Sequence, residues 1–370
     1  MKVLFITNIP SPYRIDFFNK LGKQTDLTVI FEARRAHGLT FDWNNNEDSF
    51  QSVYLSNGYI QEKKINFKIF KLLRKKRYDC VFVTNYGYLT ELAAVLFLQA
   101  LKIPYVLEVD GMVPDVCSRW KSRIKTRVIS KAEYIFSPGR LSDFCLIRYG
   151  AGKNKIIRYP FSSLSKKNIL DKPVNETERN RIRKELHIAS GIMILYAGRF
   201  IPGKGLDVLL KAFNRLPDNC QLYLIGGDAS EILINLIDSD KKDRVHFCPF
   251  MNTVHLREYY KAADVFILPT RKDVWGLVVN EAMAQGLPVI TTKKCGAGME
   301  LVRNNGLLIE PDNEQELASA VMKIVQNPEK LYQMREDSLK IIQKYTIENA
   351  VRVHCRFFRE HMQSGRERGK

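Results

Sequence analysis

The chain lacks any closely spaced pair of cysteines. Its seven cysteines are scattered, and none belongs to a C-x-x-C pair (Cys80, Cys117, Cys145, Cys220, Cys248, Cys295, Cys355). An odd number at such spacings argues against a disulfide framework and against a zinc site, whose ligands come in close pairs. We therefore expect a protein of the reducing cytoplasm.

Long apolar runs are also missing. The most apolar stretch, residues 92–101, is interrupted by Gln99 and followed by Lys102 and Pro104, which leaves it well short of the ~20 residues that span a bilayer. The apolar residues 1–7 are followed by prolines rather than by the continued apolar stretch and cleavage site of a signal peptide. We expect a first β-strand there, and any membrane contact to be peripheral.

Acidic residues are scarce relative to basic ones. The chain has 40 Asp and Glu against 58 Lys and Arg, a formal net charge of +18 at pH 7. Residues 1–165 carry net +12 of this charge and residues 166–370 net +6. Such a field attracts nucleic acid, anionic membrane or phosphorylated small molecules, and composition does not choose among them.

The rest of the composition is that of a globular protein. Hydrophobic residues make up 45 % and charged residues 26 %, without low-complexity tracts or internal repeats. A length of 370 residues exceeds what one hydrophobic core usually organises. The sequence therefore predicts two domains.

Short β-branched and aromatic runs alternate with helical patterns in both halves, which is typical of parallel sheets covered by helices. The predicted strands are residues 2–7, 27–31, 79–84, 105–109, 134–137 and 155–157, then 192–197, 221–225, 245–247, 265–268, 288–291 and 307–309. A polar segment at residues 160–177 is the predicted linker. We expect an α/β protein with a doubly wound domain over residues 1–165, a second over 166–345, and a helix at 346–370 packing back toward the first. Ligands of such sheets bind beyond the carboxyl ends of the strands, so a deep cleft between the domains is the expected site.

The first local signal, residues 197–205, reads Ala-Gly-Arg-Phe-Ile-Pro-Gly-Lys-Gly between a predicted strand and a helical run. Gly198 lets the backbone approach a ligand, and Arg199 and Lys204 can converge on a diphosphate at a helix N-terminus. The segment lacks the residue order of a P-loop, G-x-x-x-x-G-K-S/T. A plain turn with solvated Arg199 and Lys204 explains the segment equally well.

The second signal, residues 273–281, reads Asp-Val-Trp-Gly-Leu-Val-Val-Asn-Glu. Asp273 lies in the predicted loop and Glu281 on the helix, so their carboxylates can hold two hydroxyl-bearing parts of one ligand. Gly276 and Leu277 stand at the helix start, where unpaired backbone N–H groups attract an anion. Singly, the two acids are also explained as a capping Asp and an exposed helical Glu.

Both segments, with Ala-Met-Ala-Gln-Gly-Leu-Pro-Val-Ile at 282–290, closely resemble the family 4 retaining glycosyltransferases, also called glycosyl transferases group 1, of the bacterial surface-polysaccharide type. The resemblance is specific over residues 192–327. It implies the GT-B fold, two Rossmann-like domains facing across a cleft, with an acceptor-binding N-terminal domain and a nucleotide-sugar-binding C-terminal domain.

The resemblance also implies roles for residues. Arg199 and Lys204 are expected to bind the donor diphosphate, Asp273 the sugar hydroxyls and Glu281 the ribose. The donor set is completed by backbone positions (Gly198, Gly276, Leu277, Val278). The family usually has Glu where this chain has Asp273, one methylene shorter, which leaves the donor sugar open. It commonly has Phe where this chain has Trp275, a replacement that is expected to be tolerated.

No metal is expected. Many sugar transferases hold one with D-x-D, but the match at Asp238-Ser239-Asp240 is followed by further charges and is interpreted as a solvated turn. Fixed positive charge from Arg199, Lys204 and helix N-termini can neutralise the leaving diphosphate instead.

Catalytic and acceptor candidates also lie in the first half. Residues 105–111 place Glu108 and Asp110 on one face near a strand end, and Asp110 stands near a position where many family members have His. We predict that Asp110, with Arg199, Lys204 and Asp273, is catalytic, although a turn or cap role explains it nearly as well. Tyr13 and Arg14, after the first strand, are predicted acceptor contacts or part of a structural turn. No histidine is assigned a role.

Residues 63–77 and 119–131 are basic amphipathic helical patterns. Singly each fits a solvated face over ordinary core, but together they favour attachment to an anionic membrane surface. Zinc-finger and ribonucleoprotein motifs are absent, so nucleic acid is not an expected partner.

The prediction is a retaining, metal-independent hexosyltransferase that moves a sugar from a nucleotide-diphosphate donor, UDP rather than GDP, to a glycan or polyprenyl-linked glycan. The expected setting is capsule, exopolysaccharide or O-antigen synthesis at the inner face of the cytoplasmic membrane. The alternatives are a nucleotide-sugar 2-epimerase or phosphorylase on the same fold and, third, a basic polynucleotide-binding protein.

Overall fold

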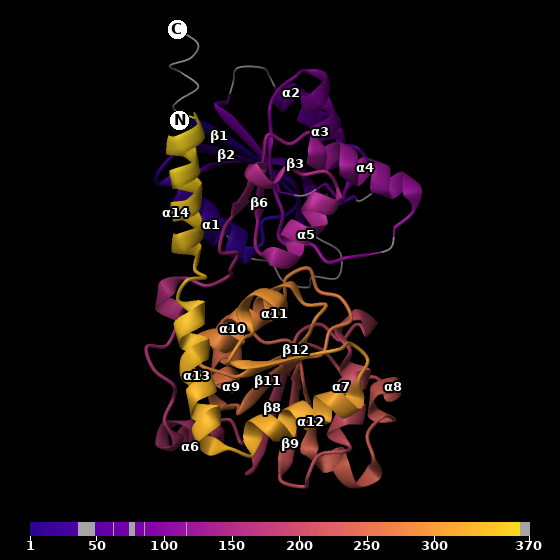
Figure 1. Ribbon diagram of the computed structural model, residues 1–370, viewed down its shortest axis with the longest axis vertical. Helices are drawn as coiled ribbons and strands as arrows, with labels where there is room; N and C mark the ends of the chain where they lie inside the picture. The colour runs from indigo at the N-terminus through magenta and orange to yellow at the C-terminus, as the bar shows by residue number, and fades with distance from the viewer. Residues whose placement is uncertain (36–48, 62, 74–77, 85, 116, 363–370) are drawn as a thin grey trace. The chain divides into compact units, whose positions relative to one another are not determined.

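The computed structural model describes residues 1–35, 49–61, 63–73, 78–84, 86–115 and 117–362 (Figure 1). The chain divides into two compact units: unit 1 comprises Met1–Ser163 and Thr346–Lys370, and unit 2 comprises Leu164–Tyr345. The break after Ser163 falls within the predicted linker. Each unit is built on one parallel sheet, as expected for a doubly wound α/β protein.

Unit 1 has a seven-stranded sheet in the order β3-β2-β1-β4-β5-β6-β7. Its strands are β1 (Lys2–Thr7), β2 (Asp26–Arg35), β3 (Gln51–Tyr59), β4 (Cys80–Val83), β5 (Val106–Glu108), β6 (Tyr134–Ser137) and β7 (Ile156–Arg158). Its helices are α1 (Pro12–Gly22), α2 (Lys68–Leu72), α3 (Leu89–Ala100), α4 (Arg119–Ser130), α5 (Arg140–Arg148) and α14 (Ile347–Phe357), which a π-helical turn at Phe358–Met362 extends.

The side chains of β1 point alternately to the two faces of the sheet, and helices cover both faces. Leu4 and Ile6 pack into an apolar cluster with residues of α3, α4 and α5. Phe5 points the other way and stacks on Phe82 with ring centroids 4.5 Å apart. Helices α1 and α14 lie side by side there, joined by the ion pair of Lys20 and Glu348 at 3.0 Å (Figure 1). The last helix of the chain therefore completes the core of unit 1.

Unit 2 has a six-stranded sheet in the order β10-β9-β8-β11-β12-β13. Its strands are β8 (Ile192–Ala197), β9 (Cys220–Ile225), β10 (Val245–Cys248), β11 (Val265–Leu268), β12 (Val289–Thr292) and β13 (Gly306–Ile309). Its helices are α6 (Glu176–Glu185), α7 (Leu206–Phe213), α8 (Glu231–Ile234), α9 (Thr253–Ala262), α10 (Leu277–Ala284), α11 (Gly296–Leu301), α12 (Glu314–Val325) and α13 (Pro328–Ile342). The order reverses direction between β8 and β11, which is where doubly wound sheets bind ligands.

Two sequence predictions were wrong. Strand β3 was missed because its Asn57-Gly58 resembles a turn and only one of its nine residues, Leu55, is fully buried, as an edge strand allows. The predicted basic helix at 63–77 is, within the described residues, only the five-residue α2, of which Ile69 alone is buried. Residues 74–77 lie outside the described part of the chain. The other basic pattern, 119–131, does form a helix, α4.

Among the described residues, no helix has both the length and the apolar character that crossing a bilayer requires. All seven cysteines are free thiols.

Candidate functional site

In unit 2 the first motif forms a loop at the carboxyl end of β8. A 3-10 turn at Pro202–Lys204 carries the lysine, and α7 begins after Gly205. Gly205 has φ +72°, and a Cβ there would lie 2.1 Å from the carbonyl oxygen of Pro269. Only glycine lets this loop approach the end of β11 so closely. The loop of the first motif therefore meets the end of β11 at the switch point of the sheet.

Two residues that follow β11 hold this loop, and the sequence interpretation had missed both. The Thr270 hydroxyl donates to the carbonyl of Gly203 at 2.8 Å, and the backbone N–H of Arg271 donates to the same oxygen at 2.9 Å. The Arg271 guanidinium also pairs with Asp207 and Asp312, each at 2.6 Å. The available signal was their position, directly after a buried strand.

The two motifs are joined by an ion pair between Lys204 Nζ and Asp273 Oδ2. Their side chains are 18 % and 11 % exposed, so the pair is sheltered yet reachable by a ligand. Asp273 is fixed by its backbone, which bonds to Lys294 and Gly296, and its Oδ1 accepts from the N–H of Trp275 at 3.3 Å. Because a lysine ammonium has three donors, Lys204 can bind an anion while keeping Asp273.

The start of α10 lies beside this pair. Gly276 precedes the helix with φ +93°, and a Cβ there would lie 2.9 Å from Cys295 Sγ and 3.4 Å from Asp273 Oδ2. Leu277 and Val278 are the first helical residues, whose N–H groups have no partner within the helix. Trp275 is buried, and its indole N–H donates to Asn280 Oδ1 at 2.9 Å, so the larger ring is accommodated in the core. The positive end of the α10 helix dipole and the Lys204 ammonium group therefore lie beside each other.

The remaining donor candidates lie on the same motifs. Gly198 and Arg199 follow β8 directly, and the Arg199 side chain is exposed while its carbonyl accepts from the Tyr196 hydroxyl at 3.0 Å. Glu281 is half-buried in α10, and the Tyr260 hydroxyl donates to it at 3.5 Å. Asp238-Ser239-Asp240 is exposed in the turn that leads into β10, at the amino edge of the sheet and away from the site.

In unit 1 the predicted residues form a second cluster. The Arg14 guanidinium pairs with Glu108 through Nη1 and with Asp110 through Nη2, and the Tyr13 hydroxyl donates to Asp110 at 3.1 Å. Arg14 is 4 % exposed, so it positions Asp110 rather than meeting an acceptor directly. The Asp110 side chain remains 34 % exposed, at the end of β5.

His354 of α14 completes this cluster, although the sequence interpretation gave no histidine a role. Its Nε2 lies 2.8 Å from Glu108 Oε2 and its Nδ1 2.8 Å from the carbonyl of Ala350, and the side chain is fully buried. Burial alone would raise the pKa of Glu108, but Arg14 and His354 lower this pKa to about 2. Glu108 is therefore a permanent anion that anchors Arg14.

A parallel sheet with a basic glycine loop and a helix N-terminus at its switch point is the arrangement that many doubly wound domains use to bind nucleotides. Residues 178–340 match the model of the family glycosyl transferases group 1.

The curated relatives agree with this family. An uncharacterized glycosyltransferase of Haemophilus influenzae is 34 % identical over 167 residues, 43 % of this chain and 46 % of the relative. The D-inositol 3-phosphate glycosyltransferase of Xylanimonas cellulosilytica is 32 % identical over 146 residues, 37 % of this chain and 35 % of the relative. The matched segment spans less than half the length of these relatives.

Solved structures cover nearly the whole chain. Anabaena HepE in complex with UDP has a TM-score of 0.80 at 17 % identity, covering 97 % of this chain and 100 % of that one. Sucrose-phosphate synthase from Thermosynechococcus elongatus has a TM-score of 0.78 at 18 % identity, covering 98 % and 100 %. These likenesses show the fold, which is the GT-B class of two doubly wound domains.

Proposed function

We propose that this chain is a glycosyltransferase that takes a sugar from a UDP-sugar and transfers it, with retention of configuration, to a glycan or lipid-linked glycan. The observation that carries the proposal is the sheltered Lys204–Asp273 pair beside the start of α10. It joins a cation for phosphate with a carboxylate for hydroxyl groups, the two chemistries of a nucleotide sugar. The solved complexes of HepE with UDP and with UDP-glucose support UDP as the nucleotide.

In the proposed reaction, the bond between the sugar C1 and the phosphate oxygen breaks while a bond from C1 to the acceptor oxygen forms on the same face. The acceptor's proton passes to the leaving phosphate. Arg199, Lys204 and the α10 N-terminus supply the positive charge that stabilises this departing diphosphate, so we propose that no metal ion is needed. Glu281 would hold the ribose, and Asp110 would orient the acceptor or the donor's sugar hydroxyls.

Thermal-shift measurements in EDTA test the donor assignment. A ligand that binds only the native state raises the melting temperature, so UDP at about 100 times its Kd is expected to stabilise the chain by about 2.7 kcal/mol. GDP and ADP are expected to give smaller shifts. No response to any of the three, or a response only with Mg²⁺, contradicts the proposal. Conversion of a UDP-sugar to its 2-epimer without acceptor would favour an isomerase instead.

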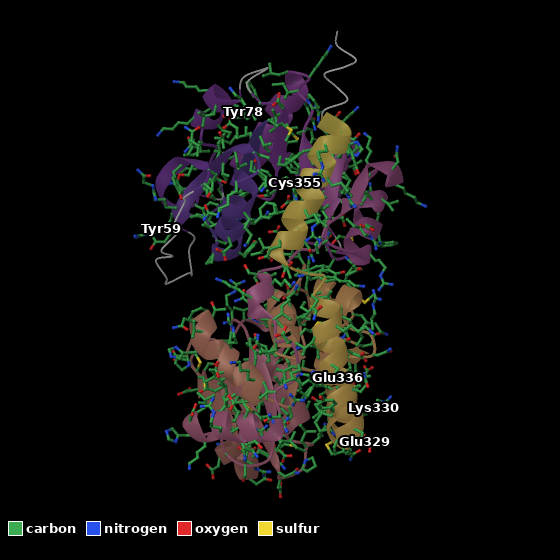
Figure 2. The ribbon with its side chains drawn as sticks, turned by 90° about the vertical axis from the view of Figure 1, so that its left-hand side faces the viewer. Tyr59, Tyr78, Glu329, Lys330, Glu336 and Cys355 are labelled. Atoms are coloured by element: carbon green, nitrogen blue, oxygen red, sulfur yellow. The ribbon has the colours of Figure 1, made fainter. Side chains whose placement is uncertain are left out.

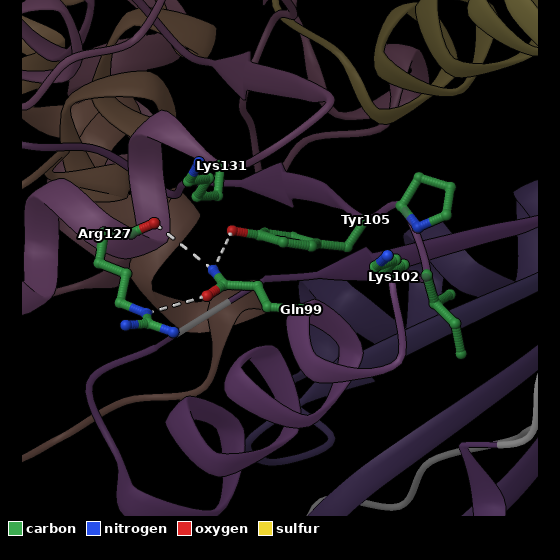
Figure 3. A pocket seen from close by; sticks show the side chains of 7 residues that line it. Gln99, Lys102, Tyr105, Arg127 and Lys131 are labelled. Carbon is green, nitrogen blue, oxygen red and sulfur yellow. Dashed lines mark hydrogen bonds between the residues drawn. The ribbon is translucent and has the colours of Figure 1, made fainter.

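We also propose that unit 1 rests on an anionic membrane surface through α4. Only Val128 and Ile129 of this helix are buried, Trp120 is 69 % exposed, and several lysines and arginines face water. At its C-terminal end is a hollow of about 520 Å³, lined by Lys102, Arg127 and Lys131 (Figure 3). Gln99 braces it, donating to the Tyr105 hydroxyl at 3.0 Å and accepting from Arg127 Nε at 3.2 Å (Figure 3).

Sedimentation with lipid vesicles tests this attachment. The chain is expected to sediment with phosphatidylglycerol vesicles and to remain in solution with phosphatidylcholine, because each basic residue near an anionic surface contributes about 1 kcal/mol. Replacing Trp120 and Arg123 together by Ala is expected to weaken binding about tenfold or more. Equal binding to both lipids, or no effect of the substitutions, contradicts the attachment.

A further inference from the structure

A second hollow in unit 1 differs from the one beside α4 in having a buried carboxyl group, Glu32, in its wall. It is a cavity of about 310 Å³, which we call the acidic cavity, lined by the end of β2, the end of β3 with the segment after it, and the start of α3 (Glu32, Ser56, Tyr59, Lys64, Asn66, Thr90). The backbone N–H of Asn66 donates to the Thr90 hydroxyl at 3.2 Å, which fixes the segment over the start of α3. The acidic cavity lies at the carboxyl edge of the sheet, where doubly wound domains bind ligands.

One carboxyl group in its wall, Glu32, and a second one beside the wall, Glu91, have oxygens without hydrogen bonds to the described residues. Glu32 lines the cavity at 5 % exposure, and its Oε2 has no partner among them. Glu91, the residue after Thr90, is fully buried, and neither of its oxygens has a partner in the described part of the chain. Burial raises the pKa of both carboxyls, and the charge of Glu32 raises that of Glu91 further. Glu32 Oε2 is thus a buried acceptor in the cavity wall without a donor among the described residues, an arrangement that is costly unless a ligand supplies one.

The carboxyl group of Glu32 indicates the chemistry of the ligand. A primary ammonium group brings three N–H donors and a positive charge, whereas a sugar hydroxyl brings one donor and no charge. Two carboxylates are fewer than a calcium or magnesium site normally uses. Tyr59 lies at the margin of the cavity with 45 % of its surface exposed, and its ring offers a stacking face (Figure 2). Lys64 also lines the cavity, with an exposed side chain.

We propose that the acidic cavity binds a primary ammonium group carried on a sugar, with Glu32 as its direct partner and the buried carboxyl group of Glu91 behind it. If the chain is the glycosyltransferase proposed above, this makes an amino sugar part of its acceptor. The naming of the acceptor rests on that function, whereas the binding of the amine does not.

Calorimetric titration of the full chain with matched sugars tests the proposal. The probes are glucosamine, glucose and N-acetylglucosamine at about pH 6.5, where the amine is protonated. Glucosamine is expected to bind at least about tenfold more tightly than the other two, because only it brings the ammonium. Equal affinity for the three sugars, or no binding of glucosamine, overturns the proposal.

Two variants and a control locate the effect. Glu32→Gln is expected to abolish the preference for glucosamine, and Glu91→Gln, which keeps the shape of the buried side chain, is expected to reduce it. Glu329→Gln removes one carboxylate from the exposed start of α13 and is expected to change nothing (Figure 2). A preference that survives in both cavity variants overturns the proposal, as does tighter binding of Ca²⁺ than of glucosamine.

Failure of the acidic-cavity proposal can be distinguished from failure of the proposed UDP site. Binding of UDP to unit 2 is expected to be unchanged in Glu32→Gln and Glu91→Gln. Normal UDP binding without glucosamine binding in the wild type removes only the acidic-cavity proposal. Glucosamine binding without UDP binding removes the transferase instead.

Discussion

Lys204→Met is expected to lower the rate of sugar transfer by about 10²- to 10³-fold, since it removes a fixed positive charge from the departing diphosphate. The loss is expected in kcat as well as in donor affinity, because charge on the leaving phosphate grows in the transition state. Release of UDP from a UDP-sugar, followed by mass spectrometry, measures the rate. Far-UV circular dichroism is expected to stay unchanged.

A matched control separates the site from general charge. Lys211 lies on α7, seven residues further along, and its side chain is exposed. Lys211→Met is expected to keep the wild-type rate within about twofold, since the attraction of an exposed charge is largely screened over a distance. If both variants lose the same activity, or if Lys204→Met turns over normally, Lys204 does not act on the diphosphate.

Arg14→Met is expected to destabilise unit 1 by about 3–5 kcal/mol, because it leaves the buried Glu108 carboxylate without its main counter-charge. Arg123→Met, an exposed arginine on α4, is the control and is expected to stay within about 0.5 kcal/mol. Thermal unfolding followed by calorimetry measures both, with the transition of unit 1 resolved from that of unit 2. A stability loss in Arg14→Met no larger than in the control would show that the Glu108 pair is not a structural anchor.

The Arg14–Glu108 pair also predicts how the stability of unit 1 depends on pH. The pKa of Glu108 is about 2 in the fold against an ordinary value of 4.5, so its carboxylate contributes stability that is fully present above about pH 4.5 and lost as pH falls through 2. The shift corresponds to about 3 kcal/mol. In Arg14→Met the pKa of Glu108 is expected to rise, because burial is no longer offset. Melting temperatures measured between about pH 2 and 7 are then expected to fall at a higher pH in the variant than in the wild type.

The fold was predictable where local pattern and tertiary burial agree. The strands β1, β6, β8 and β11 were predicted with their observed bounds, because each is a short apolar run between turn residues. Strand β3 was not, because Asn57-Gly58 carries a local turn signal that pairing with β2 overrides. The helix predicted over 63–77 is the short α2 within the described residues.

The candidate site divides in the same way. Lys204 and Asp273 lie in local motifs that the sequence displays, and the structure brings them into contact. The pairing of His354 with Glu108 joins residues 246 positions apart, and no local pattern announces it. The same holds for Arg271, whose partners Asp207, in the first turn of α7, and Asp312 are distant in the sequence. A single sequence shows which residues follow the end of a strand. It does not show which side chains from distant parts of the chain contact them.

The measurement that tests the central claim most directly is hydrogen exchange of the full chain with and without UDP, in EDTA, resolved by peptide. UDP is expected to slow exchange in peptides covering residues 198–206 and 273–281, where Gly205 and Gly276 place two helix starts beside Lys204, and Lys204→Met is expected to weaken this protection. Protection elsewhere with none in these two segments, or no protection at all, would contradict the claim.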